Sequence, residues 1–126
     1  MKEYIPLIGR LCLAMVFVLM GLQKILIFED TLTYMKDASI PFPLILLVMV
    51  IVVETAGGLA IMIGIRVKIV AFVLALYMVP TTLIFHPIWG DSIQFVDFLK
   101  NLAIAGGLLT LSYHGAGPKS IDSVNF

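Results

Sequence analysis

The sequence predicts an all-α integral membrane protein, a bundle of four transmembrane helices in a single domain that covers residues 1–126. Hydrophobic residues make up 61% of the chain and charged residues only 13%, whereas soluble domains carry about 45–50% and about 25%. A globule of 126 residues has too little interior to bury this much apolar surface. Hydrocarbon admits only helices or closed barrels, and the apolar runs here have the length of helices.

Four apolar runs are the candidate spans, and a polar tail follows them: about residues 4–28, 43–64, 69–89 and 98–113, with the tail at 114–126. The fourth run is short and opens with polar residues, so we expect it to begin near the interface. The polar connection between the first two spans predicts a short interfacial helix. Asp30 is its expected N-cap, the helix is expected to run through Met35, and Pro41 and Pro43 are expected to end it.

The basic residues orient the bundle. Arg66 and Lys68 lie in the short turn between the second and third spans, and basic residues favour the cytoplasmic side. That choice also places Lys2, Arg10 and Lys119 inside, and Lys24, Lys36 and Lys100 outside. Both termini are therefore predicted to be cytoplasmic.

Glu54 is the residue with the strongest functional signal. It lies near the middle of the second span, the most costly depth for a carboxylate, and intramembrane acids are functional by default. Gly57 and Gly58 follow on the same face and would let another helix approach closely. Two interpretations remain: a proton donor or hydrogen-bond partner for a ligand, or a polar contact that holds helices together.

Because consecutive spans cross the membrane in opposite directions, four further polar residues lie toward the same outer leaflet: Lys24, His86, Lys100 and Asn101. Together with Glu54 they form the candidate ligand-binding set, at an outward-opening cavity with a carboxyl at its floor. Glu54 and His86 are also the candidate catalytic residues, because an imidazole can protonate a bound ligand near neutral pH. Each of these residues also has an interpretation without a ligand. Lys24 would extend its ammonium group to the membrane interface, and His86 would be an interfacial residue. Lys100 and Asn101 would only close the mouth of the bundle.

Other residues are predicted to be structural. Gly21, Gly57, Gly58, Gly106 and Gly107 are expected to thin the helices where they pack. Arg10 and Asp122 are expected to pair at the cytoplasmic face if the tail folds back.

Composition also excludes several classes of function. The formal net charge is zero without any basic run, so nucleic acid is not an expected partner. The single cysteine, Cys12, excludes an intrachain disulfide, a CxxC redox pair and a thiolate zinc site. Glu54 and His86 lie at unlike depths, so no metal site is predicted.

Several segments resemble the DoxX family of small four-helix membrane proteins, in order and over nearly the whole chain. They are Arg10 with GLQK at Gly21–Lys24, ETAGGLAIMIG at Glu54–Gly64, FHPIW at Phe85–Trp89, FLKNLAIAGGLL at Phe98–Leu109 and GAGPKSID at Gly115–Asp122. The resemblance implies a multi-pass protein of the bacterial cytoplasmic (inner) membrane. Relatives in the wider DoxX/DoxD group are associated with membrane redox systems, including a thiosulfate:quinone oxidoreductase, and more distant ones act as cargo receptors or assembly chaperones.

The leading expectation is a membrane-embedded accessory subunit of a redox system that binds quinone or another apolar small molecule. The sequence carries no haem-ligand pair, flavin fingerprint or Fe–S cysteine cluster, so any catalysis is expected within a quinone-linked oxidoreductase complex whose partner subunits bring the redox centre. The alternative is a non-enzymatic assembly or scaffold protein. A transporter is a third option that would need a homo-oligomer. The lipid bilayer is a partner in every case.

Overall fold

The computed structural model describes residues 2–85 and 92–124. In these ranges the chain is all-helical, with five α-helices and one 3-10 turn: α1 (Tyr4–Leu26), α2 (Phe28–Asp37), α3 (Pro43–Ile63), α4 (Val67–Phe85), α5 (Ser92–His114) and η1 (Asp122–Val124). The predicted helical class is confirmed.

The apolar helices match the predicted spans in order, with shifted ends. Three are long and apolar enough to cross a membrane, namely Tyr4–Leu26, Pro43–Ile63 and Phe95–His114, and Val67–Leu83 is a shorter apolar helix. The fourth span was expected to begin at residue 98, but α5 already begins at Ser92. Polar residues such as Gln94 and Asp97 fit a helix that extends beyond the hydrocarbon. The expected end of the third span, residues 86–89, lies outside the described residues.

The connection after α1 forms a longer helix than predicted. The first span was expected to reach Phe28, but α1 ends at Leu26, and α2 covers Phe28–Asp37. The N-cap is Ile27, and no side chain caps it, so the prediction for Asp30 was wrong. Asp30 instead lies with Glu29 in the first turn of α2, where the positive end of the helix dipole stabilises a carboxylate.

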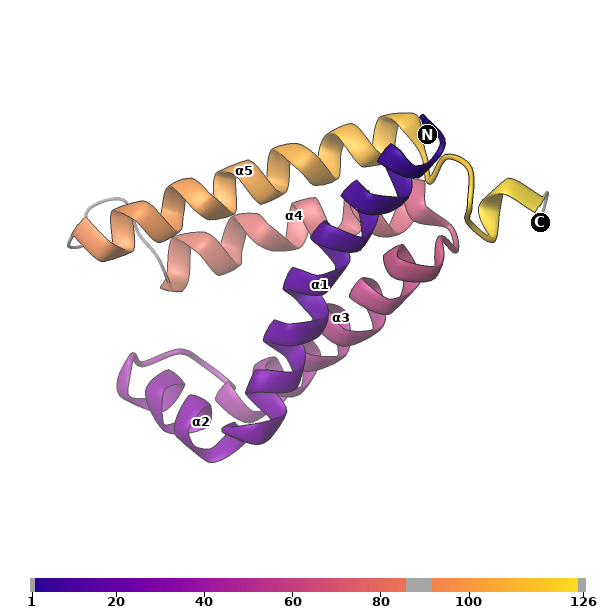
Figure 1. Ribbon diagram of the computed structural model, residues 1–126. Coiled ribbons are helices and arrows are strands. Elements are labelled where there is room, and N and C mark those ends of the chain that lie inside the picture. The colour runs from indigo at the N-terminus through magenta and orange to yellow at the C-terminus, as the bar shows by residue number, and fades with distance from the viewer. Residues whose placement is uncertain (1, 86–91, 125–126) are drawn as a thin grey trace.

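The spans are arranged as two helix pairs that meet at one end and diverge toward the other. Figure 1 shows α1 beside α3 and α4 beside α5, with both chain ends where the pairs meet and α2 at the opposite end. Core residues of all four long helices gather toward the end that holds the termini: Ala14, Phe17, Ile61, Ala71, Leu74, Ala75, Met78 and Leu108. The packed half of the bundle therefore lies near the termini, and the half near α2 has room for a cavity.

Glycines set the close approach of α1 to α3. A Cβ on Gly58 would lie 3.0 Å from the amide nitrogen of Val18 and 3.1 Å from the carbonyl oxygen of Ala14, and one on Gly21 would lie 3.2 Å from the amide nitrogen of Thr55. Gly57 fits against Leu74 of α4, and Gly107 lies in ordinary contact with Leu13 of α1. The packing role expected of Gly106 was wrong, because a Cβ there would meet nothing within 4 Å.

Gly58→Leu is therefore expected to destabilise the protein by at least about 1–3 kcal/mol, the usual cost of forcing a larger side chain into a packed interior. Gly106→Leu makes the same change on the same kind of helix, in open space, and is the matched control. Thermal unfolding in detergent measures both variants. Equal losses of stability would contradict the assignment of the α1–α3 contact to Gly58.

The polar tail folds back onto the bundle. Asp122 accepts hydrogen bonds from the backbone amides of Arg66 (2.7 Å) and Val67 (2.9 Å), so its carboxylate caps the start of α4. Arg10 donates instead to three backbone carbonyl oxygens, those of Ala116 (2.9 Å), Lys119 (2.9 Å) and Met62 (3.3 Å). The direct Arg10–Asp122 ion pair expected from the sequence does not form. Arg10 is bound by carbonyl groups of the tail and of α3, and Asp122 by amides at the start of α4.

Candidate functional site

A buried ion pair joins α1 to α3. Lys24 Nζ lies 2.9 Å from Glu54 Oε1, with 19% of the lysine side chain and 1% of the glutamate side chain exposed. Lys24 belongs to the last turn of α1 and Glu54 to the middle of α3. The close contact of Gly21 with Thr55 brings the two helices together one turn before Lys24. The lysine stem can therefore reach down to the carboxylate.

Glu54 keeps one carboxylate oxygen without a partner. Its Oε2, the Thr55 Oγ1 and the Tyr77 hydroxyl are buried polar atoms that accept or donate no hydrogen bond among the described residues. The Tyr77 hydroxyl lies close enough to Glu54 to interact with its charge, although the two do not reach the geometry of a hydrogen bond. Leaving such groups unpaired costs about 1–3 kcal/mol each, so these atoms have unused capacity to pair with a polar group of a ligand or with water.

Lys24 and Glu54 line a cavity of about 540 Å³, within the size range of small-molecule sites. Tyr77 lines a groove that adjoins this cavity. All five α-helices contribute to the lining of the cavity: Met20, Gln23 and Lys24 of α1, Asp30, Thr31 and Tyr34 of α2, Val50 and Glu54 of α3, Met78 and Thr81 of α4, and Asp97 and Asn101 of α5, with Ile27 between α1 and α2. The diverging helix pairs form its walls and α2 lies at its mouth. Polar side chains thus share the lining with the apolar side chains of Met20, Ile27, Val50 and Met78.

The charges around the cavity are unequal. Among the described residues of the lining, Lys24 is the single cationic side chain, whereas Glu54 and Asp30 are carboxylates without another basic partner in the lining. Lys24 is already paired with Glu54. An anionic ligand would therefore meet an excess of negative charge, and the site favours a neutral or cationic polar group.

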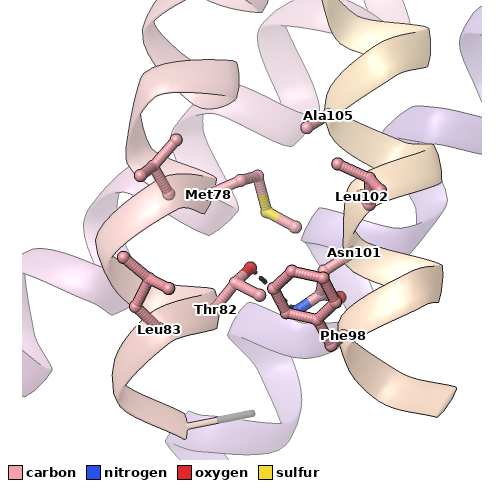
Figure 2. Close-up of a pocket in the computed structure, with 8 residues that line it drawn as sticks. Met78, Thr82, Leu83, Phe98, Asn101, Leu102 and Ala105 are labelled. Atoms are coloured by element: carbon pink, nitrogen blue, oxygen red, sulfur yellow. Dashed lines mark hydrogen bonds between the residues drawn. The ribbon is translucent and has the colours of Figure 1, made fainter. Parts of the chain in front are cut away.

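Two apolar grooves adjoin this cavity. One, of about 200 Å³, lies between α4 and α5 and shares Met78 and Asn101 with the cavity. Figure 2 shows its lining, in which Asn101 Nδ2 donates a hydrogen bond of 3.2 Å to Thr82 Oγ1. The other groove, also about 200 Å³, lies against α2, α3 and α4 and shares Val50 and Thr81 with the cavity. An amphiphilic ligand could place its polar end in the cavity and an apolar chain in either groove.

The structure separates the residues that the sequence grouped together. Lys24, Glu54 and Asn101 line one cavity. Lys100, the neighbour of Asn101, is exposed and does not line it, because one residue along a helix turns the side chain by about 100°. Its expected place in the ligand-binding set was therefore wrong. His86 lies outside the described residues.

Sequence reasoning missed Tyr77 and the acidic mouth of the cavity. Tyr77 stands in an apolar run, where an aromatic residue looks like a lipid-facing side chain. The available signal was its hydroxyl, which needs a polar partner when it is buried. Asp97 was given no role, and Asp30 was expected only as a cap. Tyr34 lay unnoticed in the interfacial connection.

Comparison with known proteins identifies the family. A sequence model of the DoxX family matches residues 5–87. The chain belongs to the DoxX family. The matched range includes Lys24, Glu54 and Tyr77, so both partners of the ion pair and the hydroxyl beside it lie within the family region.

Two inner membrane proteins of Escherichia coli K12 are similar to this DoxX protein over most of their length. YphA is 30% identical over 126 residues, which cover 96% of this chain and 90% of the relative. YqjF is 34% identical over 116 residues, which cover 92% and 88%. No solved structure matches the chain. Together with the apolar helices, these relatives place the DoxX protein in the inner membrane as a multi-pass protein.

Proposed function

We propose that this DoxX protein binds a neutral amphiphilic molecule, a quinone or a similar lipid-soluble compound, in the cavity at Lys24 and Glu54. The observation that carries the proposal is the unpartnered, buried Oε2 of Glu54, a residue that lines the cavity, with the Tyr77 hydroxyl close to the same carboxylate. The quinol form, with its two hydroxyl groups, would complement both atoms. One hydroxyl would donate a hydrogen bond to the carboxylate, and a ring oxygen of either the quinol or the quinone form would accept one from the tyrosine or from Lys24.

The electrostatics of the cavity support a neutral head group. The Lys24–Glu54 pair is neutral as a unit, and Asp30 adds negative charge to the lining. Fatty acids and phospholipids with a net negative charge are disfavoured on this ground. The apolar grooves beside the cavity suit a hydrocarbon or isoprenoid chain.

In this proposal the protein acts as an accessory subunit of a redox system. It would hold the quinone, and a partner subunit would supply the redox centre. Glu54 would hold or exchange a proton at the head group, and Lys24 would keep the carboxylate in position. Asn101 would contact the ligand from the α5 side of the cavity.

Glu54→Gln is expected to lower the amount of quinone that copurifies with the protein by about tenfold or more. The reason is that a hydrogen bond to a charged group contributes about 1.5–3 kcal/mol. The measurement is mass spectrometry of lipid extracts from protein purified out of native membranes, with quinone expressed per protein. Glu29→Gln removes an exposed carboxylate outside the cavity and serves as the control. Equal quinone content in wild type and Glu54→Gln would overturn the proposal.

The scaffold alternative predicts another pattern in the same preparations. If the ion pair only joins helices, Glu54→Ala lowers bundle stability or the recovery of a partner protein, while the small-molecule content stays the same. Measuring unfolding temperature and lipid content together separates the two functions.

A further inference from the structure

A second concave site lies at the end of the bundle that holds the termini, far along the helices from the Lys24–Glu54 cavity. It is a depression of about 580 Å³ between the start of α4 and the end of α5. Its lining combines basic and small residues: Arg66, Lys68, Ile69, His114, Gly115, Ala116, Gly117, Asp122 and Ser123.

The two cations of this depression lack carboxylate partners. Neither Arg66 nor Lys68 forms an ion pair among the described residues, and Lys119 nearby lies 3.9 Å from Glu3. Among the described residues of the lining, Asp122 is the single carboxylate, and both its oxygens are engaged by the backbone amides of Arg66 and Val67. Two basic side chains therefore stand against one carboxylate, and their N–H donors are left for another anion.

The fold also holds the two basic residues in place. Ser112 of α5 donates a hydrogen bond of 2.8 Å to the carbonyl oxygen of Lys68. The Lys68 stem lies against Gly115, and a Cβ added to this glycine would lie 3.0 Å from Lys68 Cε. Arg66 has a left-handed backbone (φ 48°), a conformation that non-glycine residues rarely adopt, and its amide is bound to Asp122. Both side chains thus start from constrained positions at the rim of the same depression.

We propose that this depression binds the phosphate head group of an anionic phospholipid in the leaflet that faces the termini. Basic pockets between transmembrane helices are a known type of site for such head groups. Ile69 lines the depression, is 61% exposed and is the first apolar residue after Lys68. An acyl chain that leaves the head group can therefore continue over Ile69 along the lipid-facing side of α4.

The test compares short-chain phosphatidylglycerol with phosphatidylcholine, titrated into the purified full-length protein in mild detergent and counted by native mass spectrometry. Wild type is expected to bind phosphatidylglycerol more tightly than phosphatidylcholine. The Arg66→Gln/Lys68→Gln variant is expected to lose about 30-fold in affinity for phosphatidylglycerol, since each basic residue near an anionic lipid contributes roughly fivefold. Lys2→Gln/Lys36→Gln has the same change in net charge, at exposed positions outside the depression, and should bind as wild type does.

Three further measurements keep the test decisive. Lys68→Gln alone leaves the Asp122 contacts intact and is expected to lose about fivefold, so the proposal is tested even if the double variant fails to fold. Inorganic phosphate at the lipid concentration should not displace the bound lipid; complete displacement would show a small-anion site and overturn the lipid assignment. Equal binding of phosphatidylglycerol to wild type and Lys68→Gln would also overturn it. Glu54→Gln should leave this binding unchanged, because the two sites are separate.

Discussion

Lys24→Met is expected to lower the free energy of unfolding by about 3–5 kcal/mol, because it leaves the Glu54 carboxylate buried without its counter-charge. Lys24 Nζ and Glu54 Oε1 are 2.9 Å apart, and the glutamate side chain is 1% exposed. The double variant Lys24→Met/Glu54→Met removes both charges and is expected to recover most of the loss, since apolar replacement of a whole buried pair is often neutral or stabilising. Equilibrium unfolding in detergent and denaturant measures the set.

The control for these Lys24 and Glu54 variants is Lys100→Met. It removes a lysine of α5 whose side chain is exposed and does not line the cavity. Its unfolding free energy should change by less than about 1 kcal/mol. If the single and double variants at the ion pair lose the same stability, the cost comes from packing of the lysine stem, and the charge pairing described here does not stabilise the fold.

Arg10→Met is the second substitution with a large expected effect, a loss of about 3 kcal/mol or more together with release of the tail. Arg10 is 2% exposed and donates to the carbonyl oxygens of Ala116, Lys119 and Met62. A hydrogen bond from a charged donor contributes about 1.5–3 kcal/mol, and Ala116 is buried, so its carbonyl would be left unpaired. Limited proteolysis should then cut residues 115–124 faster than in wild type.

Two variants sharpen this prediction. Arg10→Lys keeps the charge but lacks the fork of the guanidinium, so it should recover only part of the stability and of the protease resistance. Lys119→Met removes another cation at the same end, whose ammonium lies 3.9 Å from the exposed Glu3, and should change little. A tail in Arg10→Met that resists protease as the wild type does would show that Asp122 alone is sufficient to hold it.

The membrane class and the order of the helices could be predicted because they depend on local composition. An apolar run must form a helix in hydrocarbon wherever its neighbours lie, so α1, α3, α4 and α5 appear where the runs do. The predicted ends of the helices were less accurate. Residues 92–97 belong to α5, and Ile27 separates α1 from α2, because tertiary and interfacial contacts decide where a helix stops.

The candidate site could be predicted only in part. Glu54 was identifiable because a carboxylate in the middle of an apolar run is costly in any arrangement. The contribution of Tyr77 and the exclusion of Lys100 depend on the rotation of α4 and α5 about their axes, and hydropathy alone does not define that rotation. The tail contacts of Arg10 depend on residues about a hundred positions away, and no local pattern indicates which carbonyl groups it will meet.

The amino-acid sequence by itself determined that this DoxX protein is a helical membrane bundle with one costly acid in its second span, because solvation by lipid acts on each segment separately. Only the tertiary structure decided that Lys24 reaches Glu54, that Asn101 rather than Lys100 lines the cavity, and that the tail closes one end. Those outcomes follow from how closely α1 and α3 approach at Gly21 and Gly58 and how far the second helix pair diverges from them. Such distances arise from contacts between helices, which no single helix contains.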